Sequence, residues 1–121
     1  MRVIVAGSRG ITDYEIVRNT IDEVLNRGLL IRTIVDGMAR GVDDLAARYA
    51  VDNGIDNVRV PAEWKRYGKG AGRMRNKKMA EMADGLIAIW DGKSGGTRHM
   101  IECAKAEKLK FIFISYQIKT R

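Results

Sequence analysis

Four glycine-bearing segments hold the residues of this chain that are best suited to binding a phosphate. The first is Gly7-Ser8-Arg9-Gly10, in which the Ser8 hydroxyl and the Arg9 guanidinium can donate hydrogen bonds. Glycines let the backbone turn tightly, so that its N–H groups can face an anion. A turn that merely ends a strand has the same composition and is the alternative interpretation. The segment lacks the full G-x-G-x-x-G pattern, which disfavours NAD as a ligand.

The second segment runs from Asp36 to Asp43 and contains Gly37 and Gly41. It precedes a predicted helix, so that Asp43 and Asp44 fall in the first helical turn, where the helix dipole stabilises carboxylates. Helix stabilisation is therefore one interpretation of Asp43. The other is a contact with a ligand or with its ribose.

The third segment, residues 62–76, combines basic and aromatic side chains with glycines at positions 68, 70 and 72. We expect a flexible loop over residues 62–72, which is longer than most α/β connections, to close over an anionic ligand. Trp64 or Tyr67 can stack on a base, and a solvated loop with Trp64 at the core edge is the alternative. Its polar candidates for binding the ligand are Arg73, Arg75 and Asn76.

The fourth segment is Asp91 to Thr97, in which Gly95 and Gly96 precede a predicted N-cap at Thr97. Free N–H groups at the start of a helix, together with the Thr97 hydroxyl, would hold a phosphate or a ribose. The residue order does not fit G-x-x-x-x-G-K-[ST]. This excludes a P-loop and a Walker-type NTPase.

The remaining reactive side chains do not form a recognisable catalytic or metal-binding set. His99 and Cys103 are single residues of their type, so that neither a disulfide nor a Cys/His metal cluster is predicted. We expect His99 on the helix surface and Cys103 in the core. Glu102 is a candidate carboxylate, with a surface ion pair to Arg98 as the alternative. No metal and no cofactor is expected.

The composition is that of a basic globular protein of a single domain, residues 1–121. The net charge is +7 and the pI is about 9.8, which favours anionic partners but does not distinguish a nucleotide from a nucleic acid. One cationic stretch without acidic residues holds Lys65, Arg66, Lys69, Arg73, Arg75, Lys77 and Lys78.

The apolar stretches of this chain are of strand length and too short to cross a bilayer. Met1 leads directly into the first of them, which leaves no room for a signal peptide. We therefore expect a cytoplasmic protein without membrane contact. The oligomeric state stays open, a homo-oligomer included.

Strands and helices alternate along the chain. The patterns predict strands over residues 2–6, 31–35, 58–60, 86–90 and 111–114, with helices from a Thr12/Glu15 capping box to Gly28, and over 42–53, 73–82 and 97–108. Right-handed crossovers then give an α/β, Rossmann-like three-layer sandwich with a five-stranded parallel sheet in the order 3-2-1-4-5. Its ligand site is expected at the carboxyl ends of the strands, between the loops that follow strands one and four. The polar tail from Tyr116 is expected to fray.

Taken in order, these segments resemble the SLOG superfamily, which unites the DNA-processing protein A family with the Lonely Guy phosphoribohydrolases. The closest likeness is to its YspA/cpYpsA-related branch, and it spans nearly the whole chain. The residues that carry it are Arg2–Arg9, Gly37–Asp43, Pro61–Trp64 with Gly68, Ala71-Gly72, Arg75-Asn76 and Met79, Ala83-Asp84, and Gly95–Thr97.

The resemblance implies a Rossmann-like fold and a nucleotide-derived ligand. In the phosphoribohydrolases an arginine ahead of a P-G-G-x-G-T motif and a glutamate just after it cleave the N-glycosidic bond of nucleoside monophosphates. Arg75 or Arg73 matches the arginine region, whereas Glu102 comes a helical turn too late. The catalytic candidates are Arg75 and Glu102, with Asp13 and Asp43 as further carboxylates near the predicted rim.

Two functions follow from these observations. In the first, the chain binds a nucleotide-like phosphorylated ligand as a sensor or sequestering module, with at most weak nucleotide N-glycosidase activity. In the second, it binds nucleic acid in the manner of the DNA-processing proteins, as its basic segment would permit.

Overall fold

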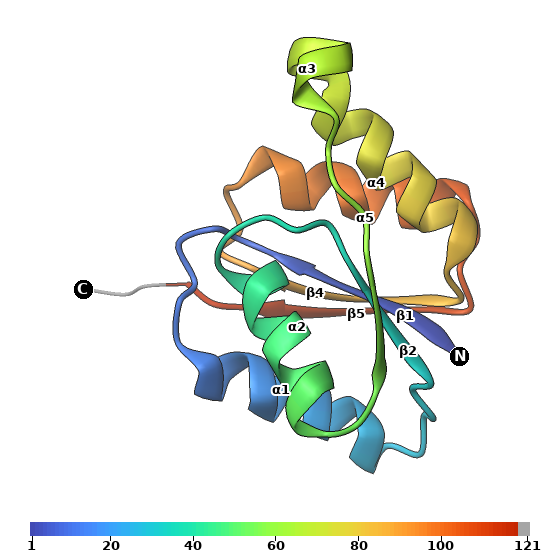
Figure 1. Ribbon diagram of the computed structural model, residues 1–121. Helices are drawn as coiled ribbons and strands as arrows, with labels where there is room; N and C mark the ends of the chain where they lie inside the picture. The colour runs from blue at the N-terminus through green and yellow to red at the C-terminus, as the bar shows by residue number, and fades with distance from the viewer. Residues whose placement is uncertain (119–121) are drawn as a thin grey trace.

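The computed structural model describes residues 1–118 and shows five parallel strands in the order β3-β2-β1-β4-β5, which confirms the predicted sheet (Figure 1). The tail residues 119–121 lie outside the described part of the chain. In chain order the elements are β1 (Arg2–Gly7), α1 (Tyr14–Asn26), β2 (Thr33–Asp36), α2 (Val42–Asp52), β3 (Asp56–Arg59), α3 (Trp64–Tyr67), the 3-10 turn η1 (Gly68–Gly70), α4 (Ala71–Met82), β4 (Gly85–Trp90), α5 (Gly95–Ala106) and β5 (Phe111–Tyr116).

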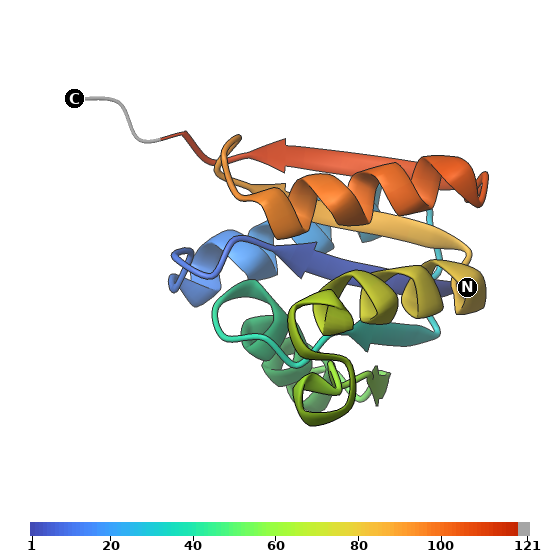
Figure 2. The same ribbon diagram turned by 90° about the horizontal axis from the view of Figure 1, so that it is seen from above.

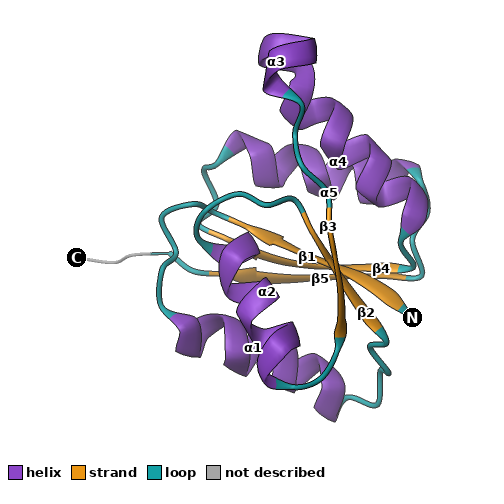
Figure 3. Ribbon diagram, in the orientation of Figure 1, coloured by secondary structure: helices purple, strands orange, loops and turns teal. Residues whose placement is uncertain are grey.

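Helices α1 and α2 cover one face of the sheet, and α4 and α5 cover the other (Figure 3). Alternate side chains of the central strand β1 point to opposite faces, so that Val3 and Val5 pack toward α1 and α2 while Ile4 and Ala6 pack toward α4 and α5. Because both faces of β1 are buried, its carboxyl end is fixed in position. Short helix α3 projects away from this body (Figure 1).

The strand order reverses between β1 and β4. Strand β1 pairs with β2 on one side and with β4 on the other, and Gly7 lies opposite Ile89 at the carboxyl end of this second pairing. The Ser8 amide donates to the Ile89 carbonyl at 3.1 Å, which joins the two strand ends. Figure 2 shows the loops that follow β1, β2 and β4 gathered at this one edge of the sheet. In open α/β sheets this edge is where ligands bind.

Three local predictions were wrong. Residues 64–70 form α3 and a 3-10 turn rather than a flexible loop. No residue of Trp64–Tyr67 disfavours a helical turn, and the helix is interrupted only at Gly68, whose φ is 57°. The α1 cap is Asp13, whose side chain accepts from the Glu15 amide, and not Thr12. Helix α5 begins at Gly95 with Ser94 as its N-cap, which places Thr97 inside the first turn.

Other element boundaries moved by a few residues, and β5 continues through Tyr116 instead of fraying there. None of the helices described is long and apolar enough to cross a membrane.

Candidate functional site

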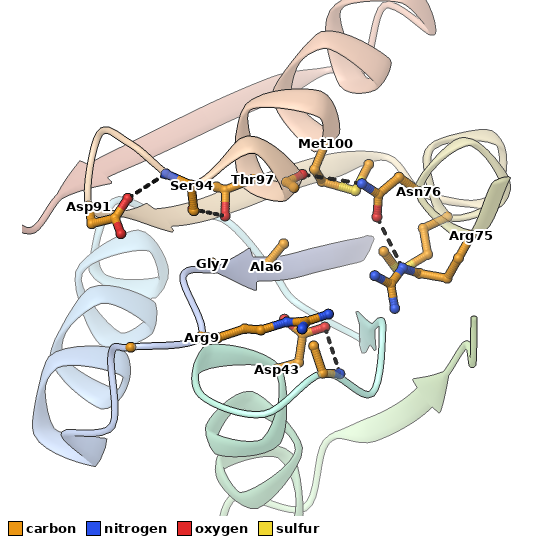
Figure 4. A pocket seen from close by; sticks show the side chains of 14 residues that line it. Ala6, Gly7, Arg9, Asp43, Arg75, Asn76, Asp91, Ser94, Thr97 and Met100 are labelled. Atoms are coloured by element: carbon orange, nitrogen blue, oxygen red, sulfur yellow. Dashed lines mark hydrogen bonds between the residues drawn. The ribbon is translucent and has the colours of Figure 1, made fainter. Parts of the chain in front are cut away.

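A cavity of about 330 Å³ opens at the carboxyl edge of the sheet, between the loops that follow β1, β2 and β4 (Figure 4). We call it the first cavity. It lies at the reversal of strand order, where the sequence predicts the site. Its lining residues are Ala6, Gly7, Arg9, Gly10, Ala39, Asp43, Arg75, Asn76, Met79, Asp91, Ser94, Gly96, Thr97 and Met100.

The amino end of α5 forms one wall of the first cavity. Asp91 shapes the approach to it, because its Oδ1 accepts from the amides of Lys93 and Ser94, both at 2.8 Å. These hydrogen bonds favour the charged carboxylate and lower the pKa of Asp91. The first turn of α5 contains no acidic residue, and its N-cap residue makes no side-chain capping bond. The positive end of this helix therefore faces the cavity with free N–H groups beside Gly96 and Thr97.

A chain of hydroxyl groups ties the end of β1 to this loop. Ser8 Oγ accepts from the Asp91 amide at 3.0 Å and lies 2.9 Å from Ser94 Oγ, which donates to Thr97 Oγ1 at 3.1 Å. Ser8 is buried, with 2% of its surface exposed, and does not line the cavity. The structure therefore places Ser8 as a tie between two loops, while Thr97 remains at the wall.

Glycines at the rim serve two different purposes. A Cβ at Gly7 would overlap the Ile89 carbonyl, and one at Gly41, which has φ 81°, would come within 2.6 Å of the Arg9 carbonyl. These two glycines permit close packing of neighbouring loops. A Cβ at Gly96 would have no atom within 4 Å. The backbone of Gly96 is therefore uncovered where it lines the cavity. Gly10, which also lines the cavity, is uncovered in the same way. At these two positions the missing side chain leaves room for a ligand.

Two arginines converge on the cavity from the side opposite α5. Figure 4 shows the Arg9 side chain extending past Asp43 toward Arg75, and the charge of Arg9 lowers the pKa of Arg75. Burial is the larger cause of that lowering, and it is opposed by the negative charge of Asp43. Arg75 also donates from Nη1 to the Gly37 carbonyl. Two guanidinium groups thus face the cavity, whose lining also includes the carboxyl groups of Asp43 and Asp91.

Asn76 holds Arg75 in place. Its Oδ1 accepts from Arg75 Nε at 3.1 Å, while its Nδ2 donates to the Gly96 carbonyl at 3.2 Å. The same Nδ2 lies 3.1 Å from His99 Nδ1, so that His99 is partly buried against α4 rather than free on the surface as predicted. Asn76 therefore links the arginine to the start of α5.

Asp43 closes the cavity beneath the arginines. Its Oδ2 accepts from the Gly37 amide at 2.8 Å and from the Ala39 amide at 3.3 Å. Burial raises the pKa of Asp43 to about 6, against the lowering effect of these two N–H groups and of Arg75. Asp43 lies in the first turn of α2, where helix stabilisation was one of its two interpretations, and from there it binds the preceding loop and lines the cavity.

A second cavity of about 410 Å³ adjoins the first and shares Arg9, Ala39 and Arg75 with it. Trp64 reaches this second cavity with half of its surface exposed, so it does not plug the core. The lining residues are Arg9, Gly37, Met38, Ala39, Arg40, Pro61, Ala62, Trp64 and Arg75.

Five predicted site residues lie outside both cavities: Ser8, Gly41, Arg73, Gly95 and Glu102. Glu102 is exposed on α5, and the described ion pairs do not include one between it and Arg98. The Arg98 guanidinium instead lies 5.7 Å from the centre of the Trp90 ring. Asp13 serves as the cap of α1.

Sequence reasoning did not single out several lining residues. Asp91 and Ser94 had a detectable signal, since Asp-x-x-Ser before two glycines is typical of a turn that leads into a helix. The apolar lining residues Ala6, Met79 and Met100 had no such signal, because their sequence pattern is the same as that of ordinary core residues. Within residues 1–118 no group of three or more His, Cys, Asp or Glu side chains is placed to hold a metal ion.

The sequence model of the YspA, cpYpsA-related SLOG family matches residues 1–67, which is more than half of the chain. The chain belongs to this SLOG family. The Gene 61 protein of Mycobacterium phage D29 is 38% identical over 112 residues, a stretch that covers 87% of this chain and 90% of that protein. No solved structure matches.

The family match includes the loops after β1 and β2 and ends within α3. The similarity to the phage protein is longer than the family match. Membership in this SLOG family points to a nucleotide-related function.

Proposed function

We propose that this SLOG protein binds a small phosphorylated, nucleotide-derived ligand in the first cavity. One observation carries the proposal: the amino end of α5, without an acid or a side-chain cap, faces the cavity opposite Arg9 and Arg75. Backbone N–H groups at a helix start bind phosphate oxygens, and guanidinium groups add charge-assisted hydrogen bonds.

The remaining lining suits the sugar of a nucleotide. Asp43 is a hydrogen-bond acceptor beside the two arginines, and ribose hydroxyls are donors that such a carboxylate can bind. The cavity volume of about 330 Å³ is at the lower end of the range for small-molecule sites, roughly 300–1,000 Å³. A nucleoside monophosphate is the simplest ligand of this kind.

Binding without efficient turnover is the role we assign, as a sensor or a sequestering module. Hydrolysis of an N-glycosidic bond needs a carboxylate beside an oxocarbenium-like sugar. Glu102 is exposed and outside the cavity, while Asp43 already accepts two backbone N–H bonds. Both observations support binding over catalysis, with N-glycosidase activity weak at most.

Isothermal titration calorimetry with a panel of nucleoside 5′-monophosphates tests this proposal. We expect saturable binding of at least one member at one site per chain, with competition by ribose 5-phosphate. Failure of every nucleotide and of ribose 5-phosphate to bind would contradict the proposal.

A second candidate function is nucleic-acid binding, favoured by the exposed surface of α3 and α4. In the part of the chain that the structure describes, its basic side chains make no ion pair. These exposed residues are Lys65, Arg66, Lys69, Arg73, Lys77 and Lys78.

Salt dependence separates the two candidates. Binding to a phosphate backbone weakens steeply with salt and extends over oligonucleotides of many lengths. A cavity saturates with one small nucleotide. Tight, salt-sensitive binding of oligonucleotides that is lost when Lys77 and Lys78 are both changed to Ala would favour the second candidate.

A further inference from the structure

We propose that the second cavity is the subsite for the base of the nucleotide, whose ring stacks on Trp64 and contacts Met38. This inference rests on the proposed function, because it takes the phosphate to lie in the first cavity. It narrows the ligand to one that carries a planar ring as well as a phosphate.

Trp64 is the first support for this subsite. Its side chain is 50% exposed although an indole gains much from burial, and it lines the second cavity. The ring is held from behind by α4, since a Cβ at Gly72 would lie 3.3 Å from Trp64 Cη2. A glycine at this position lets the indole lie close to the helix. Trp64 therefore has a supported side and an open side.

Met38 is the second support and is independent of the first. Its φ is 59°, a left-handed conformation that a residue with a long side chain rarely adopts. Asp36, which is fully buried and bound by Arg59, fixes this conformation because its Oδ1 accepts from the Met38 amide at 2.8 Å. Nevertheless 47% of Met38 is exposed at the second cavity. A glycine at this position would relieve the backbone strain. We therefore infer that the flexible, polarisable Met38 side chain is kept for contact with a ligand.

The two cavities are continuous. Arg9, Ala39 and Arg75 line both, so that a ligand with its phosphate at α5 passes between the two guanidinium groups to reach Trp64. The charged side chains of the second cavity, Arg9, Arg40 and Arg75, only donate hydrogen bonds. A ring that fits there presents acceptors at its edge, as the ring nitrogens and carbonyl oxygens of nucleobases do.

The test compares two ligands that differ by the base. Adenosine or guanosine 5′-monophosphate and ribose 5-phosphate are titrated into the unmodified protein, into Trp64→Ala and into Tyr67→Ala. Tyr67 is the matched control, because it is a partly exposed aromatic residue of the same helix that lines neither cavity. We expect Trp64→Ala to weaken nucleotide binding roughly 5- to 150-fold, the range for one base–aromatic stack. It should leave ribose 5-phosphate binding unchanged, and Tyr67→Ala should alter neither.

The outcomes separate the two proposals. Absence of binding by ribose 5-phosphate and by every nucleotide overturns the proposed function itself. If ribose 5-phosphate binds but the nucleotides bind no tighter, or if Trp64→Ala affects both ligands equally, the base subsite is wrong while the phosphate site stands. Trp64→Phe retains an aromatic face and should restore most of the nucleotide affinity, and its failure to do so would also overturn the subsite.

Discussion

Helices α2 and α5 both begin beside the first cavity after a glycine-bearing loop, and they differ in what occupies their amino ends. The first turn of α2 contains Asp43 and Asp44, and Asp43 binds the amides of Gly37 and Ala39 in the preceding loop. The first turn of α5 has no acid. Each preceding loop is held by an internal carboxylate, Asp43 before α2 and Asp91 before α5. Only α2 carries acids in its own first turn, so the first-turn N–H groups of α5 are left for an external anion. A strand–glycine–helix sequence alone does not identify a phosphate site.

Placing an acid on α5 should abolish the difference between the two helices. We expect Gly96→Asp to lower nucleotide affinity by at least ~100-fold, because it removes two or more charge-assisted contacts and adds repulsion. The same change should raise the free energy of unfolding by roughly 0.3–1 kcal/mol through the helix dipole. Titration calorimetry and thermal denaturation measure these opposite effects.

Gly96→Val and Gly95→Val are the steric controls for this prediction. A Cβ at either position has no atom within 4 Å, so both variants should fold. Only Gly96 lines the cavity, so we expect Gly96→Val to lose binding and Gly95→Val to stay within about twofold of the unmodified protein. Equal affinities of the two valine variants would contradict an anion site at α5.

Removing the cation that faces α5 should have the next largest effect. Arg75→Ala deletes a charge-assisted contact worth roughly 1.5–3 kcal/mol, which corresponds to roughly 10- to 150-fold in affinity. Arg73→Ala is the matched control, since Arg73 lies on the same helix, is exposed and lines neither cavity. If both variants bind equally well, Arg75 has no role in binding.

The acid at α2 predicts a pH dependence of stability. The pKa of Asp43 is raised from 3.8 to about 6 in the folded protein, so that between these values the folded state holds a proton that the unfolded state has lost. The free energy of unfolding therefore falls as pH rises from about 4 to 6, by roughly 2–3 kcal/mol, and does not recover above pH 6 through this group. Denaturant titrations at several pH values measure it.

Asp43→Asn should flatten that profile while keeping an oxygen for the Gly37 amide. Protonation of Asp43 also removes a negative charge beside the arginines, which favours a bound anion and opposes the effect of the phosphate's own protonation near pH 6. An Asp43→Asn variant with an unchanged pH profile would show that another group is responsible.

The smallest effect is expected at Glu102. Because it is exposed and outside both cavities, Glu102→Gln should change nucleotide affinity by less than about twofold. Chromatography of ribo- and deoxyribonucleoside monophosphates incubated with the unmodified protein should show little or no free base. Robust release that is lost in Glu102→Gln would contradict this assignment.

The sheet and the position of the first cavity were predictable, because apolar runs and glycine-bearing loops alternate regularly and the strand order follows from handedness and connection rules. The roles of single residues were harder to predict. Ser8 and Asp43 are polar residues beside glycines, yet both have their hydrogen-bonding groups engaged by the protein's own backbone. The partner of Ser8 lies in a loop 83 residues away, which local patterns do not reveal. Those of Asp43 are close in sequence but depend on how the loop before α2 folds back over the start of the helix.

Anion binding at the amino end of α5 is tested most directly by titrating 15N-labelled protein with adenosine 5′-monophosphate and following amide resonances in 1H–15N correlation spectra. We expect large, saturable shifts at Gly96 and Thr97 of α5, and small shifts at Lys65 and Lys69 of the exposed basic surface, which line neither cavity. Shifts confined to the exposed basic surface of α3 and α4, with Gly96 and Thr97 unchanged, would contradict anion binding at α5.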